Sequence, residues 1–144
     1  MLLRISSRVV WFTIQNTTSC SAEYSTSVIF NVNNLGSTAS DVTVTLYNDA
    51  GNAISTPGRA SGTTPGFALG TLYSIPGKQT IHYTAVFNAS GGAACSDRPA
   101  YGKITIESDS GLLMANGQVT AYNTTNLYTY TSYSNVIINE GKPF

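Results

Sequence analysis

Apolar and polar residues alternate one for one along much of this chain, and short runs of Gly, Pro, Asn, Asp and Ser interrupt the alternation at regular intervals. The pattern is clearest in residues 28–33, 42–47 and 81–87. Side chains that alternate in this way lie on opposite faces of a β-strand. No window of eleven or more residues has the repeat of an amphipathic helix. The sequence therefore predicts an all-β fold with about eight to ten short strands.

The length of the chain and the spacing of its turns indicate how these strands are arranged. A chain of 144 residues suits one domain with a substantial core. Short antiparallel strands joined by frequent turns are typical of sandwiches. We predict a single antiparallel β-sandwich, Ig-like or jelly-roll, in which residues 16–144 form the sandwich domain and residues 1–15 form an N-terminal strand or arm.

The composition points away from nucleic acid and from membranes as partners. Charged residues make up only 10% of the chain, and seven basic residues balance seven acidic ones, so no long-range field steers the protein toward a polyanion. The surface must be wetted instead by Thr (19), Ser (17) and Asn (12). A surface with so little charge resists self-association weakly. No apolar run approaches the roughly 18 residues of a membrane-spanning helix. We therefore expect the chain to associate with itself and to have no membrane span.

The segment RVVWFTI near the N-terminus has two interpretations. As an export signal it is poor, because Arg8 interrupts the apolar block and no clean cleavage site follows. As a strand it is good, and both of its faces are apolar, as in a strand that is covered on both sides. A free arm would expose the large side chains of Trp11 and Phe12 to water. The segment should therefore pair with another strand.

This strand is the predicted assembly interface, formed by Val9, Val10, Trp11, Phe12 and Ile14. A Ser- and Thr-rich tether at 16–27 would let it reach the exposed sheet edge of a neighbouring subunit. Main-chain hydrogen bonds would then give affinity, and alternate side chains would give register. The alternative is that residues 2–15 pair within the sheet of their own chain.

The two cysteines, Cys20 and Cys95, lie far apart in the sequence and outside any C-x-x-C motif. Zinc binding and thioredoxin-type redox chemistry therefore have no support. Both cysteines lie in segments rich in small residues, which we expect to be loops at one end of the sandwich. They form either a disulfide or two free thiols, and a disulfide would favour an extracellular or cell-surface location.

No residues form a recognisable catalytic, cofactor-binding or metal site. His82 is the only histidine, and it suits a solvent-facing position in a strand. Glu107 and Asp109 are the only close acidic pair and lie in an expected turn. The turn sequences NDAGN and ESDSG offer fewer oxygen ligands than calcium takes. The sequence therefore predicts a protein that is not an enzyme and that holds no cofactor.

Tyrosines near the C-terminus form a second candidate contact surface, made of Tyr122, Tyr128, Tyr130 and Tyr133. They lie among Thr, Ser and Asn, and tyrosine supplies a large contact area at a low entropic cost. Three roles stay open for them: strand residues that flank the core, a protein interface, or a platform for a glycan.

Several segments resemble known families. VIFNVNNLGSTASDVTVTLYNDAGN resembles the opening hairpin of small bacterial Ig-like sandwiches of the cell-adhesion-related type, in which an N-x-G corner precedes V-x-V-x-L-Y and an acidic-Gly turn. IPGKQTI and GLLMANGQVTAYN are similar to pieces of the small, oligomeric sandwiches related to sensory-rhodopsin transducers. Together these pieces cover under half of the chain. The resemblance implies a sandwich with an extracellular or interaction role, and it transfers no active-site residue.

These features predict a non-enzymatic extracellular structural protein that self-associates by β-strand addition into a filament, a pilus-like fibre or a surface coat. A small carbohydrate-binding or adhesive module that uses the tyrosine surface is the first alternative. A virion decoration protein of similar fold is the second.

Overall fold

The computed structural model describes residues 7–14, 20–107, 112–124 and 130–144, and it gives only the backbone of residues 130–133. Within these ranges the regular elements are eight strands and two 3₁₀ turns: β1 (Arg8–Thr13), β2 (Tyr24–Asn34), β3 (Ser40–Asn48), β4 (Tyr73–Ile75), β5 (Thr80–Phe87), η1 (Cys95–Asp97), β6 (Pro99–Ile106), β7 (Leu113–Asn123), β8 (Tyr130–Ile137) and η2 (Asn139–Gly141). No helix in the described part of the chain is long and apolar enough to span a membrane.

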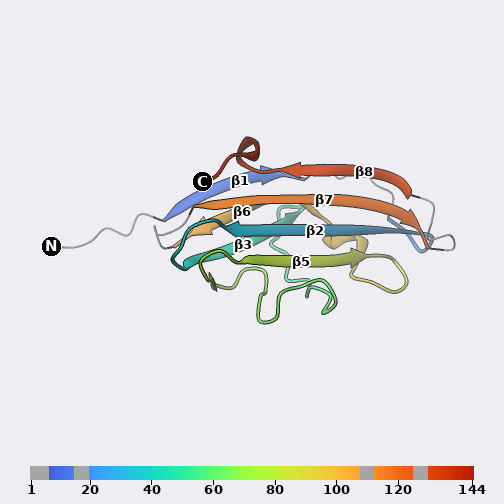
Figure 1. Ribbon diagram of the computed structural model, residues 1–144. Helices are drawn as coiled ribbons and strands as arrows, with labels where there is room; N and C mark the ends of the chain where they lie inside the picture. The colour runs from blue at the N-terminus through green and yellow to red at the C-terminus, as the bar shows by residue number, and fades with distance from the viewer. Residues whose placement is uncertain (1–6, 15–19, 108–111, 125–129) are drawn as a thin grey trace.

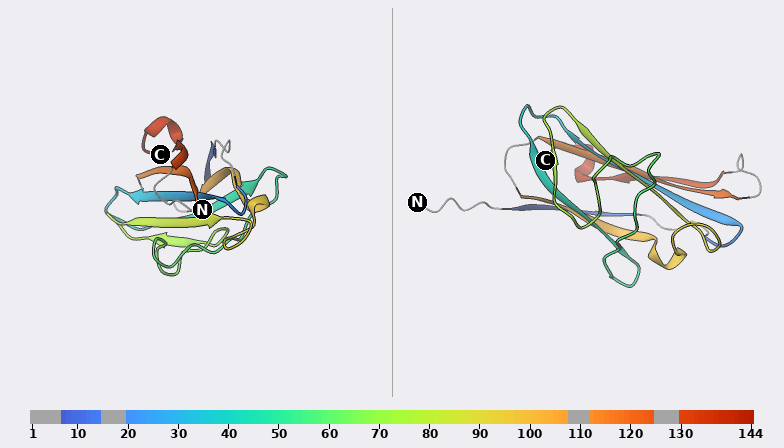
Figure 2. Two further views of the ribbon diagram at one scale, coloured as in Figure 1. Left: turned by 90° about the vertical axis from the view of Figure 1, so that its right-hand side faces the viewer. Right: turned by 90° about the horizontal axis from the view of Figure 1, so that it is seen from below.

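The strands form two four-stranded antiparallel sheets that pack face to face, so the predicted single β-sandwich is confirmed (Figure 1). The first sheet has the strand order β1-β6-β3-β4, and the second has the order β5-β2-β7-β8. Figure 2 shows the same two layers from the end and from below. The edge strands β1 and β8 approach each other along the upper side of the sandwich in Figure 1.

Alternating side chains supply the core between the sheets, as the sequence predicts. In β2 and β3 every second side chain turns inward, among them Phe30, Val44 and Leu46. In β5 the same alternation buries Tyr83 and Phe87. Full burial of a side chain of this size contributes roughly 1.5–3 kcal/mol relative to its exposure. The alternation that defines the strands therefore also stabilises the sandwich.

Residues 67–75 differ from the sequence expectation. The sequence FALGTLYSI makes them a further strand candidate, but only β4 forms at their end. Phe67 and Leu69 reach the core from turns instead, with 7% and 9% of their surface exposed. Gly66 and Gly70 explain the difference, because their φ angles of 81° and 71° do not occur in an extended strand.

The N-x-G corner after β2 depends on the buried side chain of Asn34. Its amide nitrogen donates to the carbonyl oxygens of Thr38 at 2.8 Å and Ile75 at 3.0 Å. Its Oδ1 accepts from the N–H of Gly36 at 2.9 Å. All three partners are main-chain groups, so one side chain fixes the path of the chain from the second sheet to the first.

The long connection between β3 and β4 closes one side of the sandwich, and it is drawn in green along the lower edge of Figure 1. Along β5, the N–H of Thr64 donates to the carbonyl of His82 at 2.9 Å, and the N–H of His82 donates to the hydroxyl of Thr64 at 2.8 Å. Along β3, the N–H of Gly70 donates to the carbonyl of Val44 at 2.8 Å. Sheet edges that are occupied in this way do not template a further strand.

Candidate assembly surface

Strand β1 is the edge strand of the first sheet, and within the described residues its partner strand is β6. Phe12 lies directly opposite Gly102, and its ring stacks on Phe30 of the other sheet with ring centroids 5.4 Å apart. A Cβ atom at Gly102 would lie 2.6 Å from the Phe12 ring. The glycine therefore makes the space that this ring occupies, and the first sheet contains a fitted position for β1.

The structure places β1 in the sheet of its own chain, which is the alternative that the sequence left open. Phe12 and Ile14 belong to the core, each with 5% of its surface exposed, and Val10 is half-buried. The expectation that both faces of the strand are covered is wrong for the single chain, because Val9 is 44% exposed and Trp11 is 59% exposed. Both of these side chains lie on the outer face of the sheet.

The predicted tether at 16–27 is shorter in the structure. Strand β2 already begins at Tyr24, and Cys20 is held by a disulfide to Cys95. Between Ile14 and Cys20 the sequence has five residues, and this stretch spans at most about 20 Å when fully extended. Any exchange of β1 with a neighbouring subunit is therefore limited to that distance from Cys20.

The hydrogen-bonding register shows which main-chain groups of β1 point away from the sheet. The N–H of Ile14 donates to the carbonyl of Ala100 at 2.9 Å, so the even-numbered residues of β1 bond to β6. In an antiparallel ladder the residues between them direct their N–H and C=O groups to the other side. Here those residues are Val9, Trp11 and Thr13. On that side no further strand is hydrogen-bonded to β1 in the described part of the chain.

Trp11 also belongs to a cluster of aromatic rings on the outer face, which we call the Trp11 cluster. Tyr47 of β3 and Tyr101 of β6 stack with ring centroids 4.8 Å apart, and the Trp11 ring lies 6.1 Å from the first and 6.4 Å from the second. The Nζ of Lys103 lies 5.2 Å from the centroid of the Trp11 ring, within cation–π range. The sequence did not indicate this cluster, because the pairing of β1, β6 and β3 brings the rings together.

An open groove of about 610 Å³ lies between the end of β1 and η2. Its lining includes Trp11, Thr13 and Tyr101 from β1 and β6, and Ile137 and Glu140 from β8 and η2. Ile137 is 68% exposed, so an apolar side chain of this lining is in contact with solvent in the single chain. The groove therefore continues the exposed apolar surface of β1 toward the second sheet.

The rim of this groove at η2 has an unusual backbone conformation. Asn139, Glu140 and Gly141 have φ angles of 52°, 55° and 73°, and left-handed backbone at a non-glycine residue costs roughly 1–2 kcal/mol. The side-chain amide of Asn139 donates to the carbonyl oxygens of Lys142 at 3.1 Å and Pro143 at 3.0 Å. These two bonds offset part of that cost and hold the turn beside the groove.

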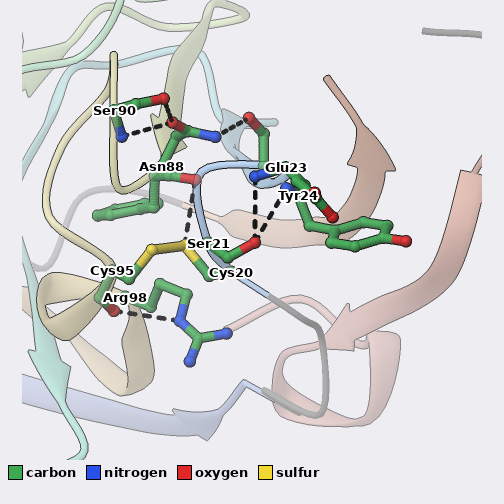
Figure 3. Close-up of a disulfide and its surroundings, with 10 residues drawn as sticks. Cys20, Ser21, Glu23, Tyr24, Asn88, Ser90, Cys95 and Arg98 are labelled. Atoms are coloured by element: carbon green, nitrogen blue, oxygen red, sulfur yellow. Dashed lines mark hydrogen bonds between the residues drawn. A yellow bond between two sulfur atoms is a disulfide. The ribbon is translucent and has the colours of Figure 1, made fainter. Parts of the chain in front are cut away.

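Cys20 and Cys95 form a disulfide, one of the two alternatives that the sequence left open (Figure 3). The Sγ of Cys20 lies 3.3 Å from the carbonyl oxygen of Phe87 at the end of β5. The Nε of Arg98 donates to the carbonyl of Cys95 at 3.1 Å. The bond therefore ties the segment before β2 in the second sheet to η1, which leads into β6 of the first sheet.

Polar side chains fix the chain around this disulfide, as Figure 3 shows. The amide of Asn88 donates to the hydroxyl of Ser25 at 3.0 Å, and its Oδ1 accepts from the N–H of Ser90 at 2.7 Å. The hydroxyl of Ser21 accepts from the N–H groups of Glu23 and Tyr24, each at 3.2 Å. The end of the sandwich beside the disulfide is therefore held by side-chain bonds to two turns.

The tyrosine surface near the C-terminus is only partly described. Tyr122 is half-buried at the end of β7, where it pairs with Tyr130 of β8 and with Ser25 of β2. Tyr128 lies outside the described residues, and of Tyr130 and Tyr133 only the backbone in β8 is described. A contact role for these tyrosines stays a prediction.

Other residues that the sequence singled out have surface or turn positions. His82 is exposed, as predicted for a strand, and its Nδ1 shares a hydrogen bond with the Oδ1 of Asn31. In the turn after β3, the Oδ1 of Asn48 accepts from two main-chain N–H groups at 3.1 and 3.0 Å. Glu107 is exposed, whereas Asp109 lies outside the described residues. Where the chain is described, no three His, Cys, Asp or Glu side chains are grouped as metal ligands would be.

Comparison with known proteins gives little beyond this geometry. No protein-family model and no curated protein matches the chain, so its resemblance to the two sandwich families stays a prediction. A solved structure titled "Crystal Structure of Thermotoga maritima 1070" is similar with a TM-score of 0.46 and 11% sequence identity, over 94% of this chain and 97% of that one. A likeness at this level carries no argument about function.

Proposed function

We propose that this chain is a non-enzymatic extracellular structural subunit, which self-associates by β-strand addition at β1 into a filament, a fibre or a surface coat. The proposal depends on the contrast between the two sides of the sandwich. The connection between β3 and β4 hydrogen-bonds along the edges of β3 and β5, whereas Val9, Trp11 and Thr13 direct main-chain groups away from the sheet. An open edge of this kind accepts an extended strand through main-chain bonds.

Apart from Arg8 at its first position, β1 also lacks the charges that usually protect an edge strand. Between Val9 and Thr13 there is no Lys, Arg, Asp or Glu, and the exposed side chains of Val9 and Trp11 are apolar. Natural edge strands are commonly very short, charged or covered. With a net charge of zero, two copies of the chain do not repel each other at long range. A second copy that covers β1 would account for this unprotected edge.

Two further observations support the extracellular part of the proposal. The disulfide between Cys20 and Cys95 is typical of oxidising compartments. The resemblance of residues 28–52 to bacterial adhesion-type sandwiches, and of two later segments to sandwiches related to sensory-rhodopsin transducers, agrees with a role in contacts between molecules.

Proline at position 9 tests the proposal. Val9→Pro removes an N–H that points away from the sheet and places a ring where an incoming strand would lie, but it leaves the bonds between β1 and β6 intact. We expect this variant to be folded by circular dichroism. It should stay monomeric in size-exclusion chromatography with light scattering, at concentrations where the natural chain forms larger species.

Val10→Pro is the matched control, because the N–H of Val10 points toward β6. This variant should lose a ladder hydrogen bond and unfold at a lower denaturant concentration than Val9→Pro. The proposal is wrong if the natural chain is monomeric at every concentration, or if Val9→Pro assembles as well as the natural chain does. Negative-stain images of the natural chain would distinguish filaments from sheets or closed particles.

A carbohydrate-binding or adhesive module is the second candidate function, and the Trp11 cluster favours it. The exposed Trp11 lines a groove whose lining also includes Thr13 and Glu140. Sugar rings stack on exposed aromatic faces while their hydroxyls bond to such groups. Trp11 is the only tryptophan, so titration with oligosaccharides should change its fluorescence if the groove binds them. An unchanged spectrum with a broad set of oligosaccharides would exclude this site.

A further inference from the structure

We infer that the partner of the β1 edge is the β1 edge of a second copy of this chain, paired antiparallel about a two-fold axis beside Trp11. The inference rests on the proposed self-association and specifies its first contact. The two copies of the first sheet, each with four strands, would then form one continuous sheet. Because the two paired surfaces are identical, the contact closes at two copies, and a larger assembly would use this pair as its repeating unit.

The outward main-chain groups of β1 determine the register of this pair. Only alternate residues of the strand, namely Val9, Trp11 and Thr13, direct N–H and C=O groups away from β6. In a two-fold antiparallel pair centred on Trp11, Val9 faces Thr13 of the partner subunit and Trp11 faces Trp11 of the partner subunit. Every outward residue of β1 then has a partner. If the register shifted by one residue, residues with outward main-chain groups would lie opposite residues whose groups point toward β6. A shift of two residues would leave some outward groups of β1 without a partner.

The side chains on the outer face fit the same register. Residues that face each other as a hydrogen-bonded antiparallel pair have Cα atoms about 5.5 Å apart, so the two indole rings would be direct neighbours. Each Trp11 ring already contacts Tyr47 and Tyr101 of its own chain. The two Trp11 clusters would therefore join across the axis, and the 59% of Trp11 that is exposed in the single chain would be largely covered.

The groove at the end of β1 supplies a position for the other apolar side chain of the edge. Val9 of the partner subunit would lie beside Thr13, which lines this groove together with the exposed Ile137. The exposed side chain of Val9 would then lie at one end of this groove, whose lining includes the exposed Ile137. The pairing thus uses the apolar surface at both ends of the strand as well as its centre.

The charge of Lys103, whose Nζ lies 5.2 Å from the centroid of the Trp11 ring, does not oppose this pairing. Lys103 lies on β6, one strand away from the edge. In the joined sheet the two copies of Lys103 would be separated by three strand spacings, about 14 Å. This separation exceeds the screening length of about 8 Å at physiological salt. The repulsion between the two ammonium groups is therefore weak.

Crosslinking of variants with one added cysteine tests the register directly. In Trp11→Cys, the Cα atoms of the introduced cysteines of two paired chains would lie about 5.5 Å apart, within the range that a disulfide bridges. We expect this variant to form a covalent dimer on mild oxidation, with mass spectrometry showing that the Cys20–Cys95 bond is retained.

Val9→Cys and Thr13→Cys are the matched pair that keeps the indole ring. Identical positions in this pair would be about 14 Å apart along the strands, so neither variant alone should crosslink. A mixture of the two should give a heterodimer, because Val9 faces Thr13 of the partner subunit. This mixture reports the register even if the loss of Trp11 weakens the first variant.

The outcomes separate this inference from the proposed function. Exchange of β1 between chains would place Trp11 opposite Lys103 of the partner subunit, so a mixture of Trp11→Cys and Lys103→Cys would crosslink while the Val9→Cys and Thr13→Cys mixture would not. That result would overturn the two-fold pair and retain self-association through β1. Crosslinking of Val9→Cys alone would show another register and overturn the inference. A natural chain that is monomeric and variants that never crosslink would overturn both.

Discussion

Trp11 and Phe12 are adjacent in the sequence, yet Phe12 is 5% exposed in the core and Trp11 is 59% exposed on the outer face. The alternation of the strand predicts that the two side chains point in opposite directions. It does not predict which face receives a second layer of protein, because that depends on the sheet that β1 joins. The exposed member of the pair is for this reason the stronger candidate for contact with another molecule.

Tyr83 couples the stability of the fold to pH. Its ring is buried, and its hydroxyl donates to the carbonyl of Thr56 at 2.9 Å. Burial raises the pKa of Tyr83 well above its ordinary value of about 10. The folded state therefore holds this proton more tightly than the unfolded state does. The stabilisation is fully present below a pH of about 10 and is lost as the pH rises from there toward the folded pKa.

We expect the free energy of unfolding to fall between about pH 10 and pH 11.5, with a shallower fall in Tyr83→Phe. At neutral pH the same substitution should cost about 1 kcal/mol, because the hydrogen bond to Thr56 is lost. Denaturant unfolding of both proteins across this range makes the measurement. Equal slopes above pH 10 would mean that Tyr83 does not carry the alkaline dependence.

The composition of the Gly- and Pro-rich segment 57–66 predicts its structure, but it does not predict its role. The segment is a loop, as its composition indicates. The sequence contains no sign that this loop lies along β5, because the contact joins residues about twenty positions apart without a pairing pattern. In the structure the loop supplies hydroxyl acceptors to the outward N–H groups of β5, and so protects that edge.

Removal of these acceptors should open the edge of β5. The hydroxyl of Thr63 accepts from the N–H of Thr84 at 3.1 Å, and the hydroxyl of Thr64 accepts from the N–H of His82 at 2.8 Å. The double substitution Thr63→Val and Thr64→Val keeps the side-chain shape, and we expect it to cost about 1–2 kcal/mol in total. Aggregation on heating, followed by light scattering, should begin at a lower temperature.

Thr45→Val on the outer face of β3 is the control for that double variant, because it adds the same kind of apolar surface away from β5. It should aggregate like the natural chain. Equal aggregation of the control and the double variant would attribute the effect to surface hydrophobicity rather than to an open edge.

At the scale of the whole molecule, local sequence patterns specify some structural features, and tertiary packing determines the others. Fold class, the inward residues of β2, β3 and β5, and the existence of the strand β1 could be predicted, because alternation is a local property of a strand. The pairing of β1 with β6 could not, since these strands are far apart in the sequence. The Trp11 cluster and the groove beside η2 depend on that pairing, so they could not be predicted either.

The disulfide crosslinks a segment before β2 of the second sheet to η1, which leads into β6 of the first sheet. Its removal tests how much this crosslink contributes to stability. Cys20 and Cys95 are 75 positions apart, and closing a loop of this length stabilises a protein by about 4 kcal/mol in the chain-entropy description. We therefore expect the double substitution Cys20→Ala and Cys95→Ala to lower the free energy of unfolding by about this amount, with the far-ultraviolet spectrum of the natural chain.

The outward groups of β1 do not depend on this bond, because the strand is held by β6 and by the contact of Phe12 with Phe30. At temperatures where the double cysteine variant is folded, it should self-associate like the natural chain. Alkylation of the unreduced natural chain should label neither thiol. Two labelled thiols would contradict the bond and remove its support for an oxidising location. Loss of assembly in a variant that is still folded would show instead that the anchor at Cys20 positions the edge of β1.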